Sequence, residues 1–216
     1  CVGVKFTQKG KEHEILAGKE VVLSGGAVNS PHILQVSGIG PQEHLQSIGI
    51  NTLHDLPGVG RNLQDHYVSR ISHRVENTDS INQLSRGIRL LREIGSWAFQ
   101  GKGALTFGIT SAMVFSRSRE GLSSPDIQLL FTPASYSQKT HGELEKEGGM
   151  TVVVCPVRPS SRGTIMAKSS DPFIRPLIRP NYFSDPDDIR VMIAGFRQAR
   201  EILSQPAFKP FSVEET

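Results

Sequence analysis

Near the start of the chain an apolar, strand-like run is followed by two glycines and a Ser-Pro pair. The run occupies residues 20–24, and Gly25, Gly26 and Ala27 come before Ser30-Pro31. Glycines let the backbone turn and let another group approach it closely. The first turn of a helix presents N–H groups that suit an anion or the polar edge of a ligand. These residues predict either a site where a large ligand lies against backbone or a simple strand-to-helix connection.

Histidine and cysteine are the other residue types here that could carry chemistry. No two of the seven histidines have the four-residue spacing of paired zinc ligands on a helix, so we expect no metal site. Cys1 and Cys155 form neither a disulfide framework nor a metal-ligand pattern. His66 follows the turn-rich segment 56–65, and we interpret it as a structural residue rather than a proton acceptor.

Composition excludes several classes of protein. Of the 216 residues, 37% are hydrophobic and 21% are charged, which is typical of a globular protein. The net charge is +3 and the basic residues are scattered, whereas nucleic-acid-binding proteins cluster them, so no nucleic-acid partner is expected. No apolar run approaches the ~20 residues that cross a membrane. We expect a reducing, cytoplasmic compartment, and we interpret the chain as an internal piece of a longer protein.

The elements that must position these residues can be read from periodicity and turn chemistry. Ser30 fits a helix N-cap and Pro31 a first helical position. Strands separated by long turns, without regular helices between them, favour an antiparallel sheet. The sequence therefore predicts a mixed α+β or α/β fold. The expected strands are 2–7, 13–17, 20–24 (buried on both faces), 67–75, 126–131, 151–157 and 163–168, and the expected helices are 42–48 (ended by Gly49), 82–100 (ended by Gly101) and 186–203.

The helix over residues 186–203 has the clearest pattern. Asp185 is its expected N-cap and Pro186 its first residue, followed by acidic residues that complement the helix dipole. One apolar stripe at helical spacing predicts the face that packs into the core. The stripe consists of Ile189, Met192, Ile193, Phe196, Ala199 and Leu203.

Three blocks of the sequence resemble one known family, the glucose-methanol-choline (GMC) flavoprotein oxidoreductases, in the family's order. The first block resembles a sequence signature of that family, the second of its two. The second block resembles the family's "PGVG-x-NLQDH" segment. The third is similar to the sheet strands and the approach to the late helix of that family. The blocks are Gly26-Ala27 with Ser30-Pro31, Ile33-Leu34 and 37–40; then 56–66; then 158–163, 170–172 and 180–185.

The resemblance implies an FAD-dependent oxidoreductase that acts on the CH–OH group of a small-molecule alcohol by hydride transfer to the flavin, closest to the choline dehydrogenase branch. It implies that residues 1–66 are the later portion of a Rossmann-like FAD-binding domain. Residues 67–216 would then be an incomplete substrate-binding domain with an antiparallel sheet. The implied cofactor-binding residues are Gly25, Gly26, Ala27, Ser30, Asn62, Asp65 and His66, and the implied substrate-pocket residues are Phe131 and Thr132.

The chain also departs from the family pattern. The phosphate-binding GxGxxG motif is absent, and the family's catalytic histidine is expected beyond Thr216, so no catalytic residue is assigned here. We therefore expect this stretch to be inactive alone and to need N- and C-terminal segments of the same protein. Two alternatives stay open: a hydroxynitrile lyase of the same family that keeps FAD, and a non-catalytic binding fragment.

Overall fold

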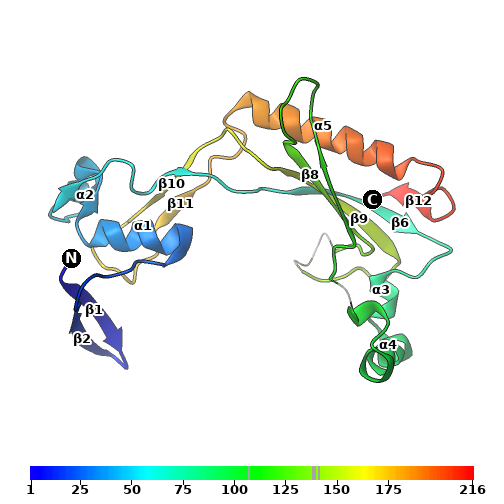
Figure 1. Ribbon diagram of the computed structural model, residues 1–216, viewed down its shortest axis with the longest axis horizontal. Coiled ribbons are helices and arrows are strands. Elements are labelled where there is room, and N and C mark those ends of the chain that lie inside the picture. The colour runs from blue at the N-terminus through cyan, green and yellow to red at the C-terminus, as the bar shows by residue number, and fades with distance from the viewer. Residues whose placement is uncertain (107, 138–139, 141) are drawn as a thin grey trace. The chain divides into compact units, whose positions relative to one another are not determined.

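The computed structural model describes residues 1–106, 108–137, 140 and 142–216, which divide into two compact units (Figure 1). The first unit combines Cys1–Leu63 with Arg162–Asn181, and the second combines Gln64–Ser161 with Tyr182–Thr216. The first change of unit lies close to the expected boundary after residue 66. The return of 162–181 to the first unit is a feature that the sequence pattern does not indicate. The assignment of the two expected domains stays a prediction.

The first unit begins with a β-hairpin. Strand β1 (Gly3–Gln8) pairs antiparallel with β2 (Lys11–Leu16). Lys9 and Gly10 form the turn with φ values of 51° and 76°. Two successive left-handed residues match the twist of the flanking strands. The expected pair of strands around a polar turn is therefore confirmed.

Residues 20–24 do not form the buried strand that the sequence predicts. They lie in no sheet of the described structure, and the side chain of Val22 is 75% exposed. A strand is stable only when a neighbouring strand satisfies its backbone N–H and C=O groups. No described segment of this chain takes that place beside residues 20–24.

Helix α1 (Gly26–Val36) begins earlier than the sequence predicts. Its N-cap is Gly25, so the expectation that Ser30 caps the helix is wrong, and Pro31 lies inside the helix. Gly26 has a φ of +78°, which glycine adopts without strain, so the turn passes directly into the helix. Pro31 then removes one backbone donor of the ladder without ending the helix.

The rest of the first unit consists of short elements. Helix α2 spans Gln42–Ser47, and Gly49 follows it with a φ of +75°. Ile50 N donates to Leu45 O at 2.9 Å, which confirms the predicted end of the helix at Gly49. Strands β3 (Ile39–Gly40) and β4 (His54–Asp55) pair in parallel. A second sheet has the order β11-β10-β5, formed by β5 (Arg61–Leu63), β10 (Gly163–Met166) and β11 (Leu177–Arg179).

The second unit is built on a five-stranded antiparallel sheet, which confirms the expected α+β character. The strand order is β12-β6-β9-β8-β7, and every neighbouring pair is antiparallel. The predicted strands near 67–75, 126–131 and 151–157 appear as β6, β8 and β9. The bounds are β6 (Ser69–Val75), β7 (Ala112–Ser116), β8 (Ile127–Thr132), β9 (Gly149–Pro156) and β12 (Ser212–Glu215).

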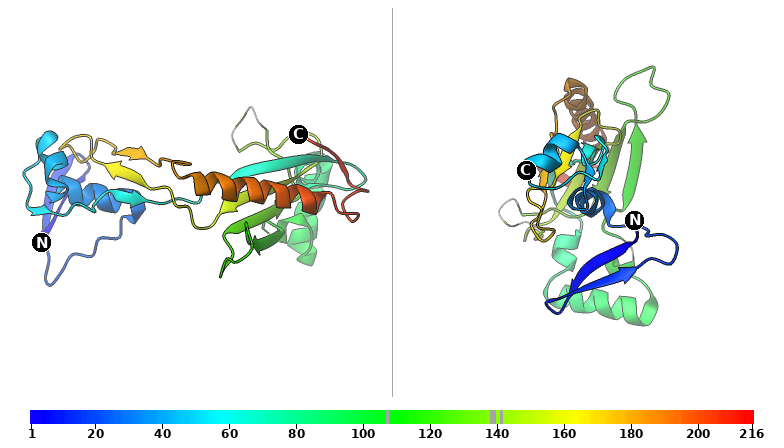
Figure 2. Two further views of the ribbon diagram at one scale, coloured as in Figure 1. Left: turned by 90° about the horizontal axis from the view of Figure 1, so that it is seen from above. Right: turned by 90° about the vertical axis from the view of Figure 1, so that its left-hand side faces the viewer.

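Helix α5 (Pro186–Leu203) covers one face of this sheet (Figures 1 and 2). The Asp185 side chain accepts a hydrogen bond from Asp187 N at 2.8 Å, which confirms the predicted N-cap. Met192, Ala199 and Leu203 of the expected stripe are buried, but Ile189 and Ile193 are exposed. The buried face is rotated toward residues 188, 191 and 195, because Gly195 lies against Val154 of β9 and Ile127 of β8 and Asp188 binds the segment after β9.

The predicted helix 82–100 is divided in two. A one-turn helix α3 (Ile81–Leu84) is followed by α4 (Gly87–Gln100), and Gly101 ends α4 in the left-handed conformation. Arg86 is extended and Gly87 has a φ of +55°, which breaks the helical path between them. A single 3₁₀ turn, η1 (Ala104–Thr106), follows.

The sheet of the second unit has two chemically different faces, because side chains alternate along a strand. Ile71, Leu129, Val152 and Val154 point to the α5 side and form the core with that helix. We call the opposite side the Arg70 face. From the strand registers, it carries Arg70, Ser72, Arg74, Met113, Phe115, Gln128, Leu130, Thr132, Thr151, Val153 and Cys155.

Candidate functional site

The N-terminus of α1 is open to a ligand. No side chain caps its first turn, and no acidic residue lies in that turn. A Cβ atom added at Gly26 would have no neighbour within 4 Å, and Gly26 and Ala27 are exposed. The free N–H groups and the helix dipole make this turn suitable for an anionic or polar ligand group. The structure thus brings Gly25, Gly26, Ala27 and Ser30 together at one helix end.

Gln35 fixes the position of α1 in the first unit. Its side chain is fully buried, its Nε2 donates to Ile165 O at 2.9 Å, and its Oε1 accepts from Ala167 N at 2.8 Å. Ile165 N also donates to Gly60 O at 2.6 Å. One amide therefore ties α1 to β10, although the two elements are far apart in the sequence.

Asn62 lies in β5 with a left-handed φ of +62° and an exposed side chain. Asparagine tolerates this conformation better than most other residues. Its neighbours Arg61 and Leu63 pair with β10, and the register shifts between them. This irregular pairing turns the Asn62 side chain to solvent. Asp65 and His66 belong to the second unit.

Asp65 and His66 have partners within the second unit. The Tyr182 hydroxyl donates to the Asp65 carboxylate, and this hydrogen bond is the main reason that the pKa of Tyr182 is raised. His66 Nε2 lies 2.8 Å from Val157 O, so Nε2 carries a proton and donates it. Gln64 Nε2 donates to Pro159 O at 2.9 Å. These contacts fasten the segment 64–66 to the chain after β9.

Phe131 and Thr132 are adjacent in β8, so they point to opposite faces of the sheet. The Phe131 ring lies 5.9 Å from the Phe208 ring, on the α5 side. There it lines an apolar cavity of about 230 Å³ together with Met150 and Phe211. Thr132 is buried on the Arg70 face, opposite Thr151. The two predicted pocket residues are therefore not brought together.

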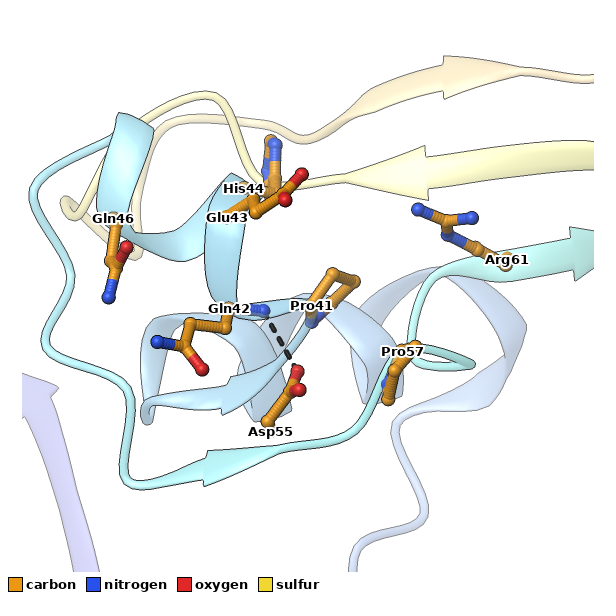
Figure 3. Close-up of a pocket in the computed structure, with 8 residues that line it drawn as sticks. All are labelled: Pro41, Gln42, Glu43, His44, Gln46, Asp55, Pro57 and Arg61. Carbon is orange, nitrogen blue, oxygen red and sulfur yellow. Dashed lines mark hydrogen bonds between the residues drawn. The ribbon is translucent and has the colours of Figure 1, made fainter.

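A polar hollow of about 740 Å³ in the first unit is a feature that sequence reasoning missed (Figure 3). Gln42 N donates to Asp55 Oδ1 at 3.0 Å across it, and Arg61 reaches it from β5. His44 points away toward Ala167 O, which its Nε2 contacts at 2.9 Å. The parallel pairing of β3 with β4 helps to bring α2 beside Asp55, and two-residue strands leave no sequence pattern. Among the described residues no acidic or histidine cluster could hold a metal ion.

A buried carboxylate joins α5 to the segment after β9. Asp188 accepts hydrogen bonds from Ser160 N at 2.7 Å and Ser161 N at 3.0 Å. Burial alone would raise the pKa of Asp188, but the hydrogen bonds from Ser161 and Ser160 outweigh it and hold the pKa below its usual value. Burial, and then the charge of Asp188, raise the pKa of Tyr67. Sequence reasoning assigned Asp188 only to the helix dipole, because its partners lie in a distant segment.

Comparison with known proteins gives one family. Two models described as GMC oxidoreductase match residues 1–68 and 159–216. Choline dehydrogenase from mitochondria of Homo sapiens is 37% identical over 100% of this chain and 36% of its own length. Alcohol dehydrogenase [acceptor] of Pseudomonas putida is 39% identical over 96% of this chain and 38% of its own length. The chloroplastic fatty acid photodecarboxylase of Chlamydomonas reinhardtii is 35% identical over 94% of this chain and 36% of its own length.

The chain thus spans less than two fifths of the length of these relatives. A solved structure of formate oxidase superposes on the whole chain with a TM-score of 0.85 and 28% identity, and this chain covers 42% of it. Another structure of formate oxidase, from Aspergillus oryzae RIB40, addresses its FAD modification. In the described residues, no helix has both the length and the apolar character needed to span a bilayer.

Proposed function

Because this chain belongs to the GMC oxidoreductase family, we propose that it is part of an FAD-dependent enzyme that oxidises the CH–OH group of a small-molecule alcohol. The observation that carries this proposal is the uncapped, exposed N-terminus of α1, which falls inside the segment matched by the first family model. Relatives named choline dehydrogenase and alcohol dehydrogenase support the reaction class. The similarity to formate oxidase, a protein studied for its FAD modification, supports FAD as the cofactor.

The described residues fit such a cofactor at α1. The free N–H groups of the turn Gly25–Gly26–Ala27 and the side-chain hydroxyl of Ser30 would contact a polar or phosphate edge of FAD. Asn62, Asp65 and His66 remain proposed cofactor residues, although Asp65 also binds the Tyr182 hydroxyl and His66 also binds Val157 O. A bound flavin would accept the hydride from the alcohol carbon. We expect the base that takes the hydroxyl proton to come from a segment beyond Thr216.

We also propose that residues 1–66 belong to the FAD-binding domain and residues 67–216 to the substrate-binding domain. Family models that match 1–68 and 159–216 separately support two distinct portions. The antiparallel sheet of the second unit supports the second assignment, because the resemblance implies such a sheet as a wall of the substrate pocket.

A pair of substitutions at one position tests the cofactor site. In the full-length protein that carries this chain, Gly26→Asp and Gly26→Asn impose the same backbone strain at a φ of +78°. Only Gly26→Asp places a negative charge at the helix end, so we expect it to weaken FAD binding about tenfold more than Gly26→Asn does. Flavin fluorescence on release measures both dissociation constants. Equal losses in the two variants would contradict a phosphate at this turn.

A second experiment separates the alternatives. Purified full-length protein is expected to be yellow and to lose its flavin absorbance when an alcohol is added without oxygen. The chain alone is expected to retain little flavin and to turn over no alcohol. Retained flavin without alcohol-driven bleaching would favour the lyase alternative, and a full-length protein without flavin would favour a binding role.

A further inference from the structure

We propose that the Arg70 face of the second unit selects alcohols with an apolar body and no positive charge, so that choline is a poor substrate. This inference rests on the proposed function and on the sheet as a wall of the substrate pocket. It concerns the chemical class of the substrate, which the names of the relatives do not settle for this chain.

The strand registers place four side chains in one row across the sheet. Arg70 of β6 lies opposite Val153 of β9, Val153 opposite Leu130 of β8, and Leu130 opposite Met113 of β7. Directly opposite side chains on one face of a sheet lie about 5 Å apart. The row is therefore an apolar strip of three side chains that ends in a guanidinium group.

The apolar end of this row is accessible. Met113 is 53% exposed and its neighbour Phe115, on the same face, is 54% exposed, while Leu130 and Val153 are partly exposed. The amide of Gln128, a polar side chain on this part of the face, already has a partner, because its Nε2 donates to Met113 Sδ at 3.0 Å. This strip offers burial for a hydrocarbon group and offers a cation no compensating charge.

Arg70 makes the other end of the row unfavourable for a cation. Its guanidinium lies 5.5 Å from the centre of the Tyr136 ring, so the aromatic face that could receive a quaternary ammonium is already occupied by a cation. On the Arg70 face, the described residues of β6, β7, β8 and β9 include no carboxylate. Recognition of choline needs several free aromatic faces or acidic groups around the cation. The row itself supplies neither, and the exposed Phe115 beside it is a single ring.

The acidic groups beside this face lie off the row. Glu214 of β12 is opposite Arg74. Glu147 forms an ion pair with Arg74, and Glu145 accepts a hydrogen bond from Ser135 Oγ at 2.7 Å. Within the row of Arg70, Val153, Leu130 and Met113, Arg70 is the charged side chain. It repels an ammonium group and attracts a polar or anionic end of a substrate.

A matched pair of alcohols tests the inference in the full-length, flavin-loaded protein. Choline and 3,3-dimethyl-1-butanol have the same shape, but only choline carries a charge. We expect kcat/KM for flavin reduction to be at least about tenfold higher for the neutral alcohol, which corresponds to about 1.4 kcal/mol. Arg70→Glu should lower this ratio by about tenfold or more, and Arg70→Gln should lower it less.

Arg197→Glu is the matched control, because it makes the same change of charge on α5, at an exposed position on the other side of the sheet. It should leave the ratio unchanged. Retained flavin absorbance shows that each variant is folded. Saturation-transfer NMR of the same two alcohols gives a readout that does not depend on turnover, with contact expected for the neutral alcohol and little for choline.

The outcomes separate this inference from the proposed function. If choline reduces the flavin as fast as its neutral counterpart, or if Arg70→Glu and Arg197→Glu act alike, the inference is wrong while the oxidoreductase stands. If neither these nor other alcohols reduce the flavin, the proposed function is wrong and the inference falls with it.

Discussion

Asp188 is the residue whose removal should cost the second unit most among its charged groups. It is 2% exposed and accepts backbone hydrogen bonds from Ser160 and Ser161. We expect Asp188→Asn to lower the free energy of unfolding by about 2–3 kcal/mol, because an amide cannot replace a charged acceptor for both donors. Urea unfolding followed by circular dichroism measures the loss. The matched change Asp187→Asn, which removes exposed ion pairs with Arg190 and Arg119, should cost less than about 1 kcal/mol.

The same carboxylate predicts a dependence on pH. Its pKa is lower in the folded chain than its ordinary value, so the folded state favours the ionised form. This contribution is complete above the unfolded-state pKa of about 4 and is lost as the pH falls through the folded-state pKa. The stability difference between the original chain and Asp188→Asn should therefore be constant near neutral pH and shrink below pH ~4. A difference that stays constant into that acidic range would show that the charge of Asp188 is not its source.

At the residue scale, local patterns predicted what depends on near neighbours and missed what depends on distant ones. Asp185 was identified as an N-cap because its partner lies two residues away. The partners of Asp188 and Gln35 lie about 27 and 130 residues away, so no local spacing reveals them. The roles proposed for Asn62, Asp65 and His66 came from the family resemblance and stay predictions.

At the element scale, the approach of α5 to the sheet makes an unusual prediction for Gly195. A Cβ atom added there would lie 2.4 Å from Cγ1 of the buried Val154. Alanine favours a helix over glycine by about 1 kcal/mol, but here overpacking should reverse the sign and destabilise the second unit by about 1–3 kcal/mol. In α4, Gly95 has no neighbour within 4 Å of an added Cβ, so Gly95→Ala should be stabilising. Thermal unfolding of both variants checks the opposite signs, and a stabilising Gly195→Ala would contradict the close packing of α5.

The elements also show which sequence patterns are sufficient. The hairpin at Lys9-Gly10 and strands β6, β8 and β9 of the larger sheet were predicted because turn residues and β-branched runs act locally, whereas β7 and β12 were not predicted. The run 20–24 has an equally apolar pattern and forms no strand, because its pattern predicts burial but not the neighbour that a ladder needs. Helix α1 starts early because Gly26 adopts a positive φ. The sequence pattern Ser30-Pro31 pointed to a later start.

At the scale of the whole molecule, the two units are not simple successive segments. The family resemblance implied a change near residue 66, but it did not indicate which earlier element a later strand joins. Strand β10 pairs with β5, and this long-range pairing returns residues 162–181 to the first unit. The first unit therefore depends on contacts between residues that are more than a hundred positions apart.

This organisation predicts that one side chain controls the stability of the first unit without affecting the second. Gln35→Leu has a similar volume, but it leaves Ile165 O and Ala167 N buried without their partner. Each unsatisfied group costs about 1–3 kcal/mol, so the first unit should lose about 2–6 kcal/mol. Gln46→Ala, at an exposed site on α2, should be nearly neutral. Native-state hydrogen exchange resolves the units: protection should fall in α1 and β10 and remain in β8 and β9. An equal loss of protection in β8 and β9 would mean that the two units unfold as one, and the discontinuous architecture would then be a single cooperative domain.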